Sequence, residues 1–130
     1  MAGAGWPELL AVAGGGALGA SGRYLLGRAV QAWAALPFPV GTLSVNVLGC
    51  LLFGALVVLL KPESLAAERW QLFLTTGLLG GFTTFSAFGH ETSELALSGR
   101  PGAAAGYAGL SLTLCLAATL LGGWVAGLTR

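Results

Sequence analysis

Uncharged polar side chains lie inside the most apolar stretches of this sequence, and their chemistry suits an ion. Asn46 falls within the apolar stretch 40–60. An amide left unpaired in hydrocarbon costs roughly 2–7 kcal/mol, so Asn46 must meet either a neighbouring helix or a permeating species. Two interpretations stay open for this residue: a hydrogen bond between helices, worth about 0.6 kcal/mol, and a donor to an ion.

The apolar stretch 70–97 carries a pair of glycines near its middle. Gly80 and Gly81 are followed by Phe82 and the threonines Thr83 and Thr84, a combination that propagates a helix poorly. The pattern predicts a third helix that is broken at mid-membrane. Non-helical backbone at that depth is tolerated only where protein covers it, and its freed carbonyls are natural ligands for a small cation.

Three aromatic residues follow the same glycine pair in the sequence. Phe82, Phe85 and Phe88 recur every three residues, so we expect them to lie on neighbouring parts of one face. An aromatic ring has a partly positive edge, and edges turned toward a pore would attract an anion without the tight binding of a lysine. An ordinary aromatic packing ridge is the alternative interpretation.

The stretch 103–128 carries a ladder of polar side chains four residues apart: Tyr107, Ser111, Cys115 and Thr119. This spacing places them on one helix face. They could offer successive hydrogen bonds to a moving ion, or bond back to carbonyls of their own helix. The three polar sets together carry donors but no charge, which favours a small anion that loses its water and then leaves again.

The composition shows which elements must position these side chains. Of 130 residues, 55% are hydrophobic and 8% are charged, against about 25% charged in a soluble domain. The mean hydropathy is +0.82. A soluble enzyme, a disordered chain and a nucleic-acid binder are excluded. Since a membrane helix needs about 20 apolar residues, the sequence predicts one all-α domain with four transmembrane helices, over residues 8–28, 40–60, 70–97 and 103–128.

The few basic residues show no bias toward one side of this predicted bundle. One side would hold Lys61, Arg69 and Arg130, and the other Arg23, Arg28 and Arg100. Because the excess of basic residues on one side normally fixes orientation, its absence predicts insertion both ways. Two copies could then pair in opposite orientations.

Small residues at a four-residue spacing predict close helix packing. The pairs are Gly15/Gly19, Gly16/Ala20, Gly102/Gly106 and Gly123/Gly127.

No catalytic apparatus is visible, so the protein is not expected to be an enzyme. His90 is the single histidine and has no cluster spaced for a metal; Glu91 and Glu94 would face a vestibule or lipid headgroups, or have a functional role that the sequence leaves open. A proton-coupled exporter of small cations, of the small multidrug-resistance type, would need an acid inside the first helix, where Glu8 stands at the extreme start. A non-transporting assembly subunit is a further alternative.

Three segments of the chain resemble the CrcB/Fluc family of fluoride channels. They are residues 22–24 (GRY), residues 41–50 (GTLSVNVLGC) and residues 80–88 (GGFTTFSAF). The resemblance covers nearly the whole length. Departures from the family pattern are Ala87 in place of a threonine, Cys115 in place of a hydroxyl, and Gly89-His90 in place of a serine.

The resemblance implies a passive fluoride channel of the bacterial plasma membrane that lowers cytoplasmic fluoride. It implies an antiparallel dual-topology homodimer with two pores, and a structural Na⁺ ion at the dimer centre held by the main-chain carbonyls of Gly80 and Thr83. Arg23 would lie at the vestibule. The pore residues carried over are Asn46, Phe85, Phe88, Tyr107, Ser111, Cys115 and, as a continuation of the polar track, Thr119.

Overall fold

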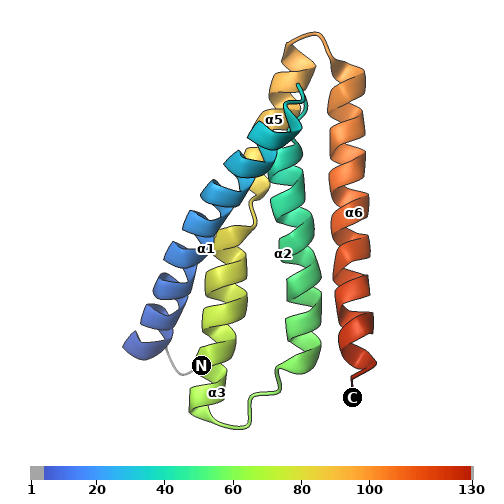
Figure 1. The fold of residues 1–130 in the computed structure, drawn as a ribbon. Helices are drawn as coiled ribbons and strands as arrows, with labels where there is room; N and C mark the ends of the chain where they lie inside the picture. The colour runs from blue at the N-terminus through green and yellow to red at the C-terminus, as the bar shows by residue number, and fades with distance from the viewer. Residues whose placement is uncertain (1–4, 130) are drawn as a thin grey trace.

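The computed structural model describes residues 5–129, and within that range all regular secondary structure is helical (Figure 1). Arg130, one of the basic residues counted above, lies outside the described residues. The helices are α1 (Trp6–Ala34), α2 (Val40–Leu59), α3 (Leu65–Leu72), the π-helical η1 (Phe73–Leu79), α4 (Gly80–Phe82), α5 (Phe85–Leu97) and α6 (Pro101–Gly127).

Four helical stretches are long and apolar enough to cross a membrane: residues 6–34, 40–59, 65–97 and 101–127. The all-α class and the four apolar spans predicted from the sequence are therefore confirmed. The first helix continues past Arg28 to Ala34 and the third begins at Leu65, so both are longer than predicted.

Local chemistry explains where these helices begin and end. The Oγ of Ser64 accepts a hydrogen bond from the Ala67 N–H (3.2 Å) and so caps the start of α3. Gln31, in the added turns of α1, donates to the carbonyls of Leu36 and Phe38, and its Oε1 accepts from the Gly41 N–H. This one side chain fastens the loop and the start of α2 to α1.

The direction of each helix decides which faces meet. In Figure 1, α1 and the α3–α5 path rise from the lower end of the bundle, whereas α2 and α6 descend side by side and therefore run parallel. The lower part of the third path, η1 and α4, packs on α1, and the upper part, α5, packs on α6. The third path thus changes its partner helix along its length.

The change of partner coincides with two residues of extended backbone between α4 and α5. Thr83 has φ −79° and ψ 158°, and Thr84 has φ −150° and ψ 122°. Neither residue is in the helical region. The Cα–Cα path is therefore redirected at this point, so that α5 leaves α1 and reaches α6.

Glycines allow the helices to approach to backbone contact at several places. A Cβ added to Gly15 or Gly19 of α1 would strike the main-chain oxygens of Phe73 and Leu78 in η1. A Cβ added to Gly54 of α2 would strike the Thr119 oxygen of α6. The close packing predicted for the Gly15/Gly19 pair is confirmed.

The close packing predicted for the glycine pairs of the last helix was wrong for contacts within this chain. A Cβ added to Gly102, Gly106 or Gly127 would meet nothing within 4 Å, and one added to Gly123 would make only ordinary contact. Gly122 makes the close approach instead, to the Leu51 oxygen of α2. The reason is helix rotation: the four-residue spacing identifies a stripe, but not which way the stripe faces.

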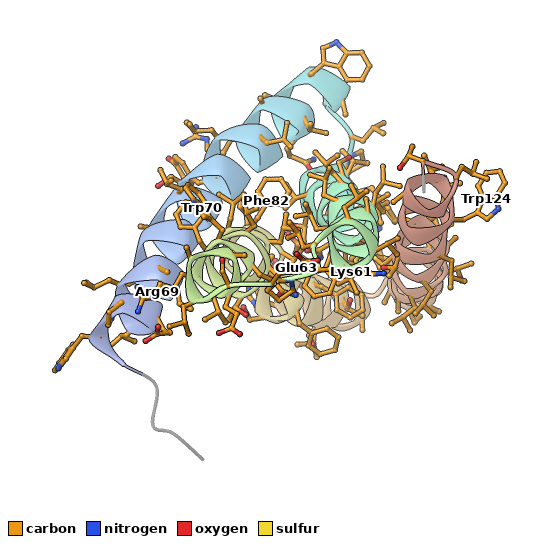
Figure 2. All side chains as sticks on the ribbon, turned by 90° about the horizontal axis from the view of Figure 1, so that it is seen from below. Lys61, Glu63, Arg69, Trp70, Phe82 and Trp124 are labelled. Atoms are coloured by element: carbon orange, nitrogen blue, oxygen red, sulfur yellow. The ribbon has the colours of Figure 1, made fainter. Side chains whose placement is uncertain are left out.

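The outer faces of the bundle are apolar. Trp33 is 88% exposed and Leu97 is 89% exposed, and few large side chains are buried within one copy. Trp70 lies in α3 and Trp124 in the last turn of α6, and the charged Lys61 lies in the loop before α3; Figure 2 labels all three in a view of the bundle from below. Tryptophans prefer the boundary between hydrocarbon and headgroups, so the outer surface suits lipid or a second copy.

Candidate functional site

The side chain of Asn46 holds the extended pair in place. Its Nδ2 donates to the Thr84 carbonyl (2.9 Å), and its Oδ1 accepts from the Thr84 N–H (2.8 Å). The amide therefore satisfies both main-chain groups of a residue that has left the helix. Of the two interpretations left open for Asn46, the bond between helices is present, and among residues 5–129 only one of its two amide hydrogens has a partner.

Two carbonyls beside this pair lose their normal helical donors. In an unbroken helix the Thr84 N–H would bond to the Gly80 oxygen, but it bonds to Asn46 instead. The Ala87 N–H would likewise bond to the Thr83 oxygen, but it donates to the Thr84 Oγ1 (3.2 Å) and caps α5. Gly80 and Thr83 are the residues carried over as Na⁺ ligands, and this chemistry of freed carbonyls fits a small cation.

A cavity of about 220 Å³ opens beside the extended pair, between α2, α5 and α6. It brings together five of the seven predicted pore residues, whereas Tyr107 and Thr119 do not line it. Its walls are Asn46, Cys50, Thr83, Thr84, Phe85, Phe88, Ser111, Leu112 and Cys115. No charged side chain is among these lining residues.

The aromatic residues fall into two groups. The rings of Phe85 and Phe88 lie 5.2 Å apart between centroids, at 49°, and the ring of Phe88 lies 5.4 Å from that of Tyr107. The expectation that Phe82 shares their face was wrong. Its ring lies between Gly22 of α1 and Gly49 of α2, because the extended residues separate it from the helix that carries the other two (Figure 2).

The polar ladder of α6 also divides. Ser111 is 5% exposed, and its hydroxyl has no hydrogen-bond partner among the described residues. The Thr119 hydroxyl instead donates to the Cys115 carbonyl of its own helix (3.0 Å). It faces a second cavity of about 180 Å³, which is also lined by Gly80 and Thr83.

Glu91 is a member of the site to which the sequence assigned no definite role. One carboxylate oxygen accepts from the Thr42 hydroxyl (2.6 Å), and the other accepts from the hydroxyl of Tyr107 (2.6 Å). Tyr107 is fully buried, so its hydroxyl is held on the carboxylate. The signal in the sequence was the three-residue spacing from Phe88, which places Glu91 one turn above the aromatic pair.

A third cavity, of about 440 Å³, lies between α1, α2 and α5 and contains Arg23, Arg28 and Glu91 among its lining residues. The Nε of Arg23 is buried, and in the described part of the chain it has no hydrogen-bond partner. Thr84 borders both this cavity and the 220 Å³ cavity. Arg23 therefore lines a cavity that meets the uncharged cavity at Thr84.

The charged groups in two further pairs do not line the three cavities described above. His90 Nε2 is 3.7 Å from Glu94 Oε2, and both side chains are largely exposed. Glu8 pairs with Arg69 at 2.9 Å, between the start of α1 and α3. Within residues 5–129, no group of three or more His, Cys, Asp or Glu side chains could hold a metal.

Four apolar helices, three of which line an uncharged, donor-lined cavity, define a small helical membrane protein. The family described as CrcB-like protein, Camphor Resistance (CrcB), matches residues 10–123. The chain belongs to this family.

Several bacterial relatives share most of the sequence. The chain is 49% identical over 124 residues to a protein of Cereibacter sphaeroides named fluoride-specific ion channel FluC, covering 92% of this chain and 98% of the relative. A protein of the same name from Ruegeria sp. is 51% identical over 115 residues, covering 88% and 90%. One from Granulibacter bethesdensis is 44% identical over 107 residues, covering 82% and 84%.

Proposed function

We propose that this protein is a passive, fluoride-selective channel that lets fluoride leave the cytoplasm across the bacterial plasma membrane. The observation that carries the proposal is the 220 Å³ cavity, which is rich in donors and free of charged side chains. The bacterial relatives named as fluoride-specific channels support it.

The cavity can replace the water of a small anion with several weak contacts. The unpartnered Ser111 hydroxyl is a buried donor that an anion would satisfy. The remaining amide hydrogen of Asn46 and the ring edges of Phe85 and Phe88 add further positive character. Because no lysine or arginine lines this cavity, the ion is not held too tightly to leave.

The neighbouring groups give the path a direction. Fluoride would gather at the basic cavity of Arg23 and then pass Thr84 into the uncharged cavity. The hydroxyl of Tyr107 lies above, and the ladder continues through Cys115 toward Thr119. Since the Thr119 hydroxyl already donates to its own helix and the Tyr107 hydroxyl to Glu91, these two contribute less as donors than Ser111.

A second copy in the opposite orientation would complete the site. Phe85 borders the cavity and yet is 77% exposed, so one chain leaves the cavity open on a side that a partner can close. The third span, broken at mid-membrane, would lie near the dimer axis. Two copies would then place the freed carbonyls of Gly80 and Thr83 around a Na⁺ ion, which would fix the interface.

The alternative of a proton-coupled cation exporter is not favoured. That mechanism needs an acid inside the bundle that can exchange protons with substrate. Glu8 stands instead at the first turn of α1 and is held by Arg69. The relatives are named as channels for an anion.

Fluoride efflux from liposomes, followed with a fluoride electrode, tests the proposal. The purified full chain is expected to release fluoride but not chloride, at a rate that an imposed proton gradient leaves unchanged. Phe85→Ile and Phe88→Ile should each slow efflux strongly while the size-exclusion profile stays that of the parent. Liposomes that release no fluoride would support the non-transporting subunit, and coupling to protons would support the exporter.

A further inference from the structure

Two cysteines face each other between α2 and α6. The two helices run parallel (Figure 1) and come into backbone contact where Gly54 meets the Thr119 oxygen. Cys50 and Cys115 each stand four residues before those contact points. One turn along two parallel helices preserves both the face and the level, so the two thiols meet across the same interface.

The cavity and the interaction between the side chains agree with this placement. Both cysteines line the 220 Å³ cavity, both are half-buried, and neither is in a disulfide. The two thiol groups are close enough to interact electrostatically. Within residues 5–129, no third His, Cys, Asp or Glu is positioned to join them as a metal ligand.

We infer that Cys50 and Cys115 form a two-thiol site for a soft divalent cation that accepts two sulfur ligands, with Hg²⁺ as the representative ion. On binding, two S–H bonds break, two S–Hg bonds form, and both protons pass to water. The product carries no net charge, so it avoids the cost of leaving a charge in an apolar cavity. A four-coordinate ion such as Zn²⁺ lacks its remaining ligands here and is excluded.

The site has a consequence for transport that rests on the proposed function. An ion held between Cys50 and Cys115 lies in the same cavity as Asn46, Phe88 and Ser111. It would fill space that the permeating anion needs. The groups that attract the anion would keep their charges. Occupation of the site therefore closes the pathway.

Binding is measured first, without reference to transport. The full chain in detergent is titrated with mercuric chloride, and the mercury–thiolate absorbance and the intact mass are followed during competition with a monothiol. The parent is expected to hold one Hg²⁺ per chain. Cys50→Ser and Cys115→Ser should each weaken retention by about 100-fold or more, the ordinary advantage of two linked ligands over one. Zinc chloride should produce no such complex.

Two Hg²⁺ ions per chain, or a single-cysteine variant that retains mercury as well as the parent, would overturn the two-thiol site.

Fluoride efflux is measured separately, with each variant compared with its own untreated rate. Mercury should stop efflux by the parent and spare the double Cys50→Ser/Cys115→Ser variant. Bound mercury with undiminished efflux would overturn the blocking role alone. If the untreated parent shows no efflux, the channel function is refuted and the metal site still stands.

Discussion

The replacement of Asn46 by alanine separates the positioning role of this residue from ordinary helix packing. The change removes the two hydrogen bonds to the main chain of Thr84 and adds no new group. The Thr84 N–H can find a partner again only by returning to the Gly80 carbonyl, which requires Thr83 to become helical. The substitution therefore favours closure of the extended segment.

The expected magnitude follows from the groups left unpaired. Each buried main-chain group without a partner costs about 1–3 kcal/mol, which gives about 2–6 kcal/mol for two. Hydrogen bonds between membrane helices average about 0.6 kcal/mol when lost groups find other partners, so the lower part of the range applies. A cost of about 3 kcal/mol lowers the ratio of the extended to the helical conformation about 100-fold.

Fluoride efflux from liposomes and amide hydrogen exchange at Thr84 measure this prediction together. Asn46→Ala should reduce efflux by up to about 100-fold, the factor by which the conformational ratio changes, and should alter exchange at Thr84. Ser93→Ala is the matched control, because the Ser93 hydroxyl is exposed and donates to the Gly89 carbonyl of its own helix (2.9 Å). Full efflux from Asn46→Ala with unchanged exchange would refute the positioning role of the amide.

Three further substitutions test other parts of the site. Gly54→Ala places a methyl group against the backbone of α6 and should destabilise the protein by about 1–3 kcal/mol in thermal unfolding. The control Gly106→Ala points into open space and should not destabilise it. Equal melting temperatures of the two variants would contradict the packing. Ser111→Ala removes a hydroxyl without a partner and should lower efflux while leaving stability unchanged, and a loss of stability would show that the hydroxyl is structural. Glu91→Ala leaves the buried Tyr107 hydroxyl unpaired and should cost about 1–3 kcal/mol of stability, and an unchanged melting temperature would argue against that contact.

Much of this protein is predictable from the order of its residues. Composition and the length of the apolar stretches are enough to predict four membrane-spanning helices, because hydrocarbon offers backbone groups no other partner. The polar residues inside those stretches were equally visible, since their burial in lipid has a large cost. Asn46, Ser111 and Cys115 were singled out on that ground. Phe85 and Phe88 were singled out by their three-residue spacing and by the resemblance to the CrcB/Fluc family, and all five residues line one cavity.

What only the tertiary structure decided is which partner each of these groups has. Helical spacing gives the face of a residue but not the rotation of one helix against the next, so Gly106 faces open space while Gly122 contacts α2. The extended residues Thr83 and Thr84 separate Phe82 from the other phenylalanines, an effect that a regular three-residue spacing hides. The hydrogen bonds between Asn46 and the Thr84 backbone join residues from different helices, and their geometry exists only after α2 has packed beside the third span.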